Sequence, residues 1–301
     1  MTDPLSAAKA EVEAGLAAAV PPRTATLVVD DGTEIAYHRW DADPGVDQDP
    51  VPVVLQHGFS VDTLVEWAAR GTVAALTAAG RAVVGVDARG HGRSRKSPDP
   101  ARYGERRMAR DLRAVIAALD VPAVDLVGYS MGGIIALLTA TEERAVRRLV
   151  VGGIGAGVVE LGGVDTRVLP DDVLAEALLA EHPRTLSPVV AGMRGFAEVI
   201  GADLPSLAAQ ARSVHKGHID LAAITVPTLV IAGDDDPLAE RPHVLADAIP
   251  GARLRVIAGD HGTATGSPAF RSAIVQFLTQ PGPVPDLVTG SAQSPLDHRG
   301  R

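Results

Sequence analysis

The sequence contains no cysteine, and this absence excludes several kinds of chemistry at once. Disulfide bonds, thiolate nucleophiles and zinc sites built on cysteine are all impossible in this chain. Aromatic residues are also scarce, at 3% of the 301 residues, whereas hydrophobic residues make up 46%. We therefore expect a sizeable core that is assembled mainly from alanine, valine, leucine and isoleucine side chains.

The chain also lacks an excess of basic residues over acidic ones. The chain has 28 lysine and arginine residues against 37 aspartate and glutamate residues, which gives a net charge of −9. Phosphate backbones and anionic lipids attract basic surfaces, so we expect neither nucleic acid nor a membrane as a partner. The first 22 residues lack the pattern of a signal peptide, and other apolar runs are too short to cross a bilayer. These features predict a cytoplasmic protein, and they leave its oligomeric state open.

Short strand-like and helix-like segments alternate along most of the chain. This alternation predicts an α/β protein with a mostly parallel sheet and helices on both faces. The expected strands are 26–29, 34–40, 51–56, 82–86, 124–127, 148–151, 228–232 and 254–257. The expected helices of the same region are 67–79, 106–119, 132–141 and one that begins at Ser267-Pro268.

The rhythm changes in three places, and these changes predict the domain organisation. Residues 1–22 form an N-terminal helical extension, with a helix over 5–20. Residues 23–156 and 224–280 form the core. Residues 157–223 lack clear strands and predict a helical cap, with helices over 171–181, 188–200 and 204–214. Residues 281–301 are rich in proline, glycine and serine, which predicts a flexible tail.

The segment Gly128-Tyr129-Ser130-Met131-Gly132 matches the pattern G-x-S-x-G. It follows an expected strand and precedes an expected helix, which is the context that a nucleophilic serine of this kind requires. Small residues on both sides of Ser130 allow a sharp turn that lifts its hydroxyl above the sheet. A chance glycine-rich turn would lack this flanking arrangement, so the pattern favours Ser130 as a nucleophile.

The loop after the strand 51–56 reads His57-Gly58-Phe59. An acyl-transfer enzyme needs two backbone N–H donors for its oxyanion, and we expect them at Phe59 and at Met131, the residue after the nucleophile. His57 lies too early in the chain to be the expected base, and a structural hydrogen bond is the better interpretation.

A second polar loop, Asp87-Ala88-Arg89-Gly90-His91-Gly92-Arg93-Ser94, follows the next strand. Its charged groups are expected to pair with one another and to shape the turn.

Together, in this order, the motifs H-G-F, D-x-R-G-H-G-x-S and G-Y-S-M-G-G resemble the esterase, lactonase and cofactor-free haloperoxidase branch of the α/β-hydrolase superfamily. The resemblance covers about residues 24–279. It implies an α/β-hydrolase fold with an eight-stranded, mostly parallel sheet and a triad in the chain order serine, aspartate, histidine. It also implies that the acid and the base follow two later strands.

Both expected positions carry suitable residues. His261 follows the last strand, and a run of three aspartates follows the strand before it. The slot after the strand 148–151, where some relatives place the acid, has no carboxylate. The family pattern Gly-x-x-Asp favours Asp236, and Pro237 restrains its backbone. Asp234 is the main competitor because it points to the same side of an extended chain.

Other signals were weighed and set aside. The glycine-rich segment 153–157 lacks the last small residue of a dinucleotide loop. His215 and His218 have a metal-like spacing but no evident third ligand. The aspartates 234–236 lack the remaining ligands of a calcium loop. A serine nucleophile also excludes dehalogenase and epoxide hydrolase chemistry, which need a carboxylate nucleophile.

The sequence therefore predicts a carboxylesterase-like enzyme (class EC 3.1.1) that acts on a small-molecule ester, lactone or thioester and needs no cofactor or metal. Ser130, Asp236 and His261 are its expected catalytic residues. The cap residues Met193 and Phe196 are expected at an apolar acyl pocket, although helix packing explains them equally well. Acyl transfer, carbon–carbon bond hydrolysis, perhydrolysis and a slow-turnover receptor remain open alternatives.

Overall fold

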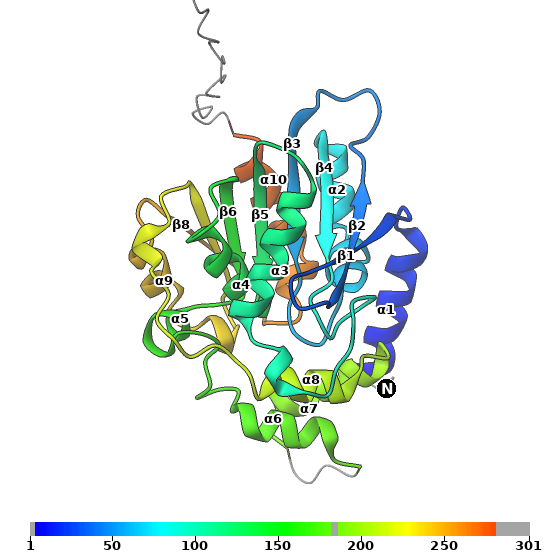
Figure 1. The fold of residues 1–301 in the computed structure, drawn as a ribbon, viewed down its shortest axis with the longest axis vertical. Helices are drawn as coiled ribbons and strands as arrows, with labels where there is room; N and C mark the ends of the chain where they lie inside the picture. Colours follow the sequence, from blue (N-terminus) through cyan, green and yellow to red (C-terminus); the bar gives the residue numbers. More distant parts are fainter. Residues whose placement is uncertain (1–3, 182–185, 281–301) are drawn as a thin grey trace, which may run out of the picture.

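A computed structural model describes residues 4–181 and 186–280, which form an eight-stranded sheet covered by helices (Figure 1). The expected tail 281–301 lies outside the described residues. The strand order is β1-β2-β4-β3-β5-β6-β7-β8. Strand β2 runs antiparallel to β1 and β4, and the six strands β3 to β8 run parallel to one another. The strands are β1 Arg23–Val28, β2 Glu34–Trp40, β3 Asp49–Gln56, β4 Arg81–Val86, β5 Val124–Tyr129, β6 Val146–Gly152, β7 Thr228–Gly233 and β8 Arg253–Ile257.

Helices connect the strands, as expected for parallel pairs, which need crossover connections. None of the helices among residues 4–181 and 186–280 is long and apolar enough to cross a membrane. The helices are α1 Pro4–Ala18, α2 Thr72–Ala78, α3 Glu105–Ala118, α4 Met131–Ala140, α5 Ala156–Leu161, α6 Asp171–Leu179, α7 Pro188–Val199, α8 Leu204–Ala211, α9 Pro242–Ala248 and α10 Pro268–Leu278. A short π-helical turn, η1, spans Leu64–Ala68.

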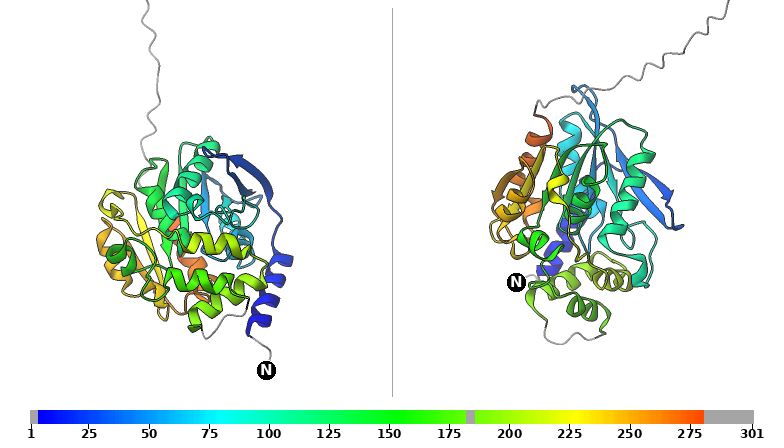
Figure 2. Two further views of the ribbon diagram at one scale, coloured as in Figure 1. Left: turned by 60° about the horizontal axis from the view of Figure 1, so that its bottom comes forward. Right: turned by 60° about the vertical axis from the view of Figure 1, so that its left-hand side comes forward.

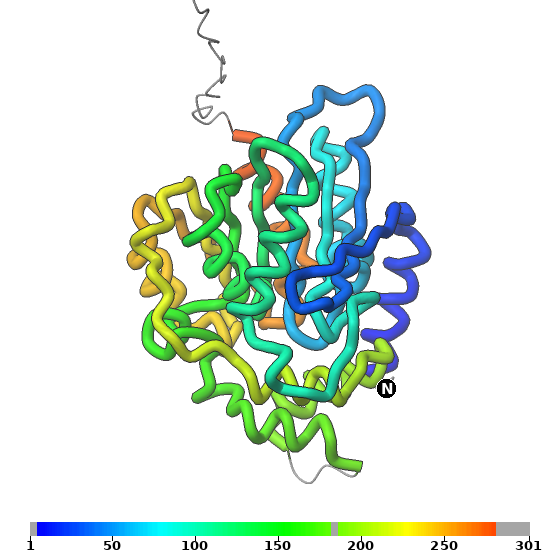
Figure 3. The backbone as a smooth tube through the Cα atoms, in the orientation of Figure 1, coloured from blue at the N-terminus to red at the C-terminus, as the bar shows by residue number. Residues whose placement is uncertain are grey.

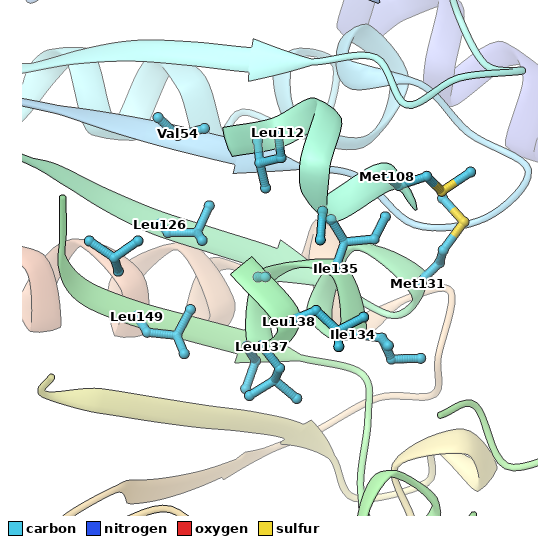
Figure 4. Close-up of a cluster of buried hydrophobic side chains, with 14 of the residues drawn as sticks. Val54, Met108, Leu112, Leu126, Met131, Ile134, Ile135, Leu137, Leu138 and Leu149 are labelled. Atoms are coloured by element: carbon cyan, nitrogen blue, oxygen red, sulfur yellow. The ribbon is translucent and has the colours of Figure 1, made fainter. Parts of the chain in front are cut away.

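Two hydrophobic cores lie on opposite faces of the sheet. Successive side chains of a strand point to opposite faces, so Leu126 and Leu149 pack against α3 and α4, as Figure 4 shows. Their neighbours Val127 and Val150 belong to the second core, with α2 and α10. Burying each such side chain contributes about 1.5–3 kcal/mol. This double burial explains why the central strands read as continuous apolar runs.

The segment between β6 and β7 forms a helical cap at the carboxyl ends of the parallel strands (Figures 1 and 2). Helices α6, α7 and α8 bury apolar side chains against one another in a third core. Leu174, Leu178, Val190, Ala197 and Leu207 are among its buried members. The cap therefore has its own packing and covers one edge of the sheet.

One expected helix proved wrong in its extent. The sequence suggested a single helix over 67–79, but the structure has the π-helical turn η1, a break, and then α2. Gly71 in the break has a φ of 77°, a left-handed conformation that no helix interior tolerates. Helices α5 and α9 were not predicted. Both are only one to two turns long, which is too short for a periodic pattern to show.

Glu105, at the start of α3, joins the core to the cap. Its side chain accepts hydrogen bonds from Gln210 Nε2 at 3.2 Å and from the backbone N–H of His215 at 2.6 Å. The residue is only 2% exposed, and this burial raises the pKa of Glu105 from 4.5 to about 7. The carboxyl group is therefore neutral in the folded protein at pH values where it ionises in the unfolded chain.

We expect this group to make the protein less stable as the pH rises from about 4.5 to 7, because the folded state binds the extra proton in that window. Glu105→Gln removes the effect. Between pH 5 and pH 8, the wild-type protein should lose on the order of 2 kcal/mol of unfolding free energy relative to this variant. Denaturant titration at both pH values measures the difference. Glu13→Gln, at an exposed position, is the control, and its unfolding free energy should change with pH as that of the wild type does. If the difference in unfolding free energy between the wild type and Glu105→Gln were the same at both pH values, the interpretation would be wrong.

Candidate active site

Ser130 sits at the turn between β5 and α4 in an unusual backbone conformation. Its φ of 55° and ψ of −121° lie outside the regions that residues with a side chain prefer. The turn is tight because Gly128 and Gly132 approach their neighbours closely. A Cβ on Gly132 would lie 2.1 Å from the carbonyl oxygen of Gln56, and one on Gly128 would lie 2.1 Å from that of Gly132. Neither glycine position of the motif therefore has room for a side chain.

His261 lies between Ser130 and Asp236. Its Nε2 is 2.9 Å from Ser130 Oγ, and its Nδ1 is 2.9 and 3.0 Å from the two carboxylate oxygens of Asp236. A carboxylate only accepts hydrogen bonds, so Nδ1 donates to Asp236 and Nε2 is left to accept from the serine hydroxyl. Asp236 is buried and His261 keeps a partly exposed edge. The structure thus brings together three residues from three separate loops.

The other two aspartates of the run lie elsewhere. Asp234 Oδ1 accepts a hydrogen bond from the backbone N–H of Gly259 at 2.9 Å, which helps to shape the turn before His261. Asp235 is exposed to solvent. Asp236 also accepts from the N–H of Leu238 at 2.9 Å, and this bond fixes its carboxylate at the start of a 3₁₀ turn. The contact with His261 therefore belongs to Asp236.

The loop after β3 lies directly against the serine. A Cβ on Gly58 would be 3.3 Å from the Cβ of Ser130. Neither Phe59 N–H nor Met131 N–H donates a hydrogen bond within the part of the chain that the structure describes. Met131 N–H is also one of the free donors at the first turn of α4, where the helix dipole favours negative charge. Both N–H groups are therefore available to an oxyanion.

His57 holds this loop in place. Its Nε2 accepts from the backbone N–H of Ala88 at 3.0 Å, so its Nδ1 carries the proton and donates to the carbonyl oxygen of Gly58 at 2.7 Å. That carbonyl and the N–H of Phe59 belong to one planar trans peptide and point in opposite directions. By fixing the carbonyl, His57 fixes the direction of the Phe59 N–H. The histidine is completely buried, and both of its ring nitrogens are engaged in these two hydrogen bonds.

The charged side chains Asp87 and Arg89 of the polar loop 87–94 form ion pairs with residues of other elements, and the loop also has hydrogen bonds within itself. Asp87 is buried, which by itself would raise its pKa, but hydrogen bonds from His38 and the N–H of Arg93 together lower the pKa below its usual value. Arg89 forms a bidentate salt bridge with Asp111. Burial lowers the pKa of His91 to about 3, so this imidazole is neutral. The loop is a structural support behind the site.

A cavity of about 770 Å³ opens beside Ser130 and His261. A much smaller one, of about 30 Å³, also borders Ser130 and lies between Met131 and the cap. Phe196 borders the larger cavity, and Met193 borders both. The two cap residues singled out from the sequence are therefore placed at the cavity walls. Their contact with a substrate stays a prediction.

Several residues of the site carried no signal in the sequence. Tyr129 donates a hydrogen bond from its hydroxyl to the carbonyl oxygen of His261 at 2.8 Å. Arg70 donates to the carbonyl of Gly262 and to the hydroxyl of Thr265. Both contacts fix the loop that carries His261, and they join residues far apart in the chain. Tertiary contacts of this kind leave no local pattern to read.

His215, one of the two histidines with a metal-like spacing, has a structural contact of its own. Among residues 4–181 and 186–280, no group of three or more histidine, aspartate or glutamate side chains is placed to hold a metal ion. His215 instead donates its backbone N–H to Glu105 at the junction of cap and core.

Comparisons with known proteins agree with this geometry. A family model described as the alpha/beta hydrolase fold matches residues 51–161. A non-heme haloperoxidase of Rhodococcus erythropolis is 28% identical over 272 residues, which are 79% of this chain and 93% of that protein. The magnesium-chelatase 30 kDa subunit of Rhodobacter capsulatus is 31% identical over 252 residues, 74% of this chain and 84% of that protein. The crystal structure of a hydrolase from Pseudomonas aeruginosa PA01 has a TM-score of 0.67 at 27% identity, and the match covers 86% of this chain and 99% of that one.

The choice among the aspartates can be tested directly. Asp236→Asn should lower turnover of an ester by roughly 10³–10⁴-fold, because an amide in this place favours the wrong histidine tautomer. The melting temperature should change little, since the side chain keeps its shape.

Asp234→Asn is the matched control, because asparagine can still accept from Gly259. It should cost less than about tenfold, or ~1.4 kcal/mol of barrier. If Asp234→Asn were the crippling change and Asp236→Asn the mild one, the assignment of the acid would be wrong.

Proposed function

The chain belongs to the α/β-hydrolase superfamily, and on that premise we propose that it hydrolyses carboxylic esters, lactones or thioesters through an acyl-enzyme on Ser130. One observation carries the proposal: His261 lies within hydrogen-bond distance of both Ser130 Oγ and the buried carboxylate of Asp236. A serine hydroxyl is a weak nucleophile by itself and needs an adjacent base that a third group orients.

Each group has a role that follows from its position. His261 Nε2 takes the proton of Ser130 as the serine oxygen adds to the substrate carbonyl carbon. Asp236 stabilises the imidazolium that forms. The N–H groups of Phe59 and Met131 bind the oxyanion, and each such donor is worth about 3 kcal/mol. His261 then protonates the leaving oxygen or sulfur, and a water molecule that it deprotonates releases the acyl group.

The two cavities would hold different parts of the substrate. The leaving group must lie close enough to His261 to receive its proton, and His261 borders the larger cavity. The smaller cavity also borders Ser130, but it lies against Met131 and Ile134. We therefore assign the larger cavity to the leaving group and the smaller one to the acyl group. With about 30 Å³, room for roughly two or three water molecules, the smaller cavity admits only a short acyl chain.

A fluorophosphonate probe tests the proposed nucleophile, because it reacts with activated serines and spares ordinary ones. We expect mass spectrometry to find one adduct, on Ser130, and none on the Ser130→Ala variant. The wild-type protein should also turn over 4-nitrophenyl acetate many times.

Labelling at another serine, or release of a single equivalent of nitrophenol without further turnover, would count against the enzyme. The latter result would favour a receptor. Formation of peracid when hydrogen peroxide is added would instead favour perhydrolysis, the activity that the likeness to a haloperoxidase suggests.

The cavity assignment gives a second expectation. Among 4-nitrophenyl esters, kcat/KM should fall at least tenfold from acetate to hexanoate, because the longer chain exceeds the smaller cavity. Leu169→Ala enlarges that cavity and should restore activity toward hexanoate.

Phe196→Ala is the matched control, since it removes bulk from the larger cavity. It should leave the ranking of acyl chains as it is. If Phe196→Ala changed the acyl preference and Leu169→Ala did not, the two assignments would have to be exchanged.

A further inference from the structure

Helix α1 supplies part of the wall of the larger cavity. Leu5, Ala8, Glu11 and Val12 border it, and they lie on one side of the helix. They come from the first residues of the chain, more than 100 positions before Ser130. The views in Figures 2 and 3 show α1 beside the cap, at the end of the sheet where the parallel strands finish.

The helix is held against two different elements. A Cβ on Gly15 would lie 2.3 Å from the carbonyl oxygen of Ala69, so the helix backbone rests directly on the end of η1. Nearer its start, Leu5 packs against α7, where a Cβ on Gly195 would be 2.8 Å from the leucine side chain. Helix α1 therefore bridges the core and the cap across the cavity.

The attachment of α1 is nevertheless slight. Leu5, Ala8, Val12 and Gly15 form a half-buried stripe with helical spacing, and no residue of the helix whose side chain is described is fully buried. After the helix, the Val20 carbonyl accepts a hydrogen bond from Trp40 Nε1 at 2.8 Å, which ties the following segment to the sheet. Because α1 adds little to any core, we expect changes on its surface to affect the cavity more than the stability.

The cavity that α1 closes has two kinds of lining. Leu5 and Val12 of α1 and Phe196 of α7 are apolar lining residues. Glu11 of α1, Glu66 and Arg70 are charged ones. Its volume of about 770 Å³ is within the range of small-molecule sites, roughly 300–1,000 Å³. Such a space suits a bulky, mainly apolar group far better than a methyl or ethyl group.

We propose that α1 is a specificity element: it forms the outer wall of the leaving-group cavity and selects esters or thioesters whose alcohol or thiol part is large and apolar. The proposal rests on the function proposed above for Ser130 and His261. It adds that residues remote from the reacting atoms decide which leaving group is accepted.

Adjacent alanines on α1 provide a matched test in the full-length protein. Ala8 faces the cavity and Ala7 faces solvent. Ala8→Phe places a ring inside the cavity, whereas Ala7→Phe places the same ring outside it. With 2-naphthyl acetate and ethyl acetate as substrates, we expect Ala8→Phe to lower kcat/KM for the naphthyl ester at least tenfold more than for the ethyl ester. Ala7→Phe should change neither value more than twofold.

The binding of 2-naphthol, monitored by its fluorescence, tests the role of α1 as a cavity wall without any reaction at Ser130. Ala8→Phe should weaken this binding at least tenfold and Ala7→Phe should not. Gly15→Val, which must lift the helix off Ala69, should weaken it as well. Melting temperatures of all variants show whether they fold.

The outcomes separate the two proposals. Equal losses on both esters, or unchanged 2-naphthol binding in folded Ala8→Phe and Gly15→Val, would overturn the role of α1. A different outcome is that the wild-type protein hydrolyses neither ester, while 2-naphthol binding is weakened by Ala8→Phe and Gly15→Val but not by Ala7→Phe. That result would support α1 as a wall of the cavity and would contradict the proposed hydrolytic function.

Discussion

The backbone of Ser130 is the constraint on which the rest of the site depends. A residue with a side chain adopts a φ of 55° here because the chain must turn sharply from β5 into α4. The turn is possible only where Gly132 lets the helix touch the carbonyl of Gln56 at the end of β3. The same contact brings the loop 57–59 against the serine. One local geometry thus places the loop that carries the Phe59 N–H beside the residue that carries the hydroxyl.

The sheet then determines how distant residues reach that point. Strands β5 to β8 are neighbours and parallel, so the loops that follow them emerge at one edge. His261 lies 131 residues after Ser130 and is still 2.9 Å from it. Tyr129 and Arg70 hold the loop of His261 from two sides. The orientation of the imidazole therefore depends on packing and not on its sequence neighbours.

The sequence was informative where the signal is local. Apolar runs identified the central strands, and the glycine spacing identified the turn at Ser130. The single helix over 67–79 was wrong because the left-handed Gly71 interrupts it, and one glycine in a helical pattern does not announce a break. Spacing alone could not separate Asp234 from Asp236, because only the turn after β7 decides which carboxylate meets the histidine. The contributions of α1 and Arg70 required the tertiary structure.

The parts of the site differ in how freely they can vary. Ser130, His57 and Asp236 are buried among close contacts that a changed side chain would break. The stripe of α1 is only half-buried, and replacing one of its residues disturbs few contacts besides those with a ligand. Substitutions in the first group are therefore expected to impair the proposed reaction or the stability of the fold. A loss of about 1–3 kcal/mol is a large share of a domain's total stability. Substitutions in α1 alter the shape of the cavity at little cost. Under the proposed function, a division of this kind would let the accepted leaving group change while the proposed reaction at Ser130 stays the same.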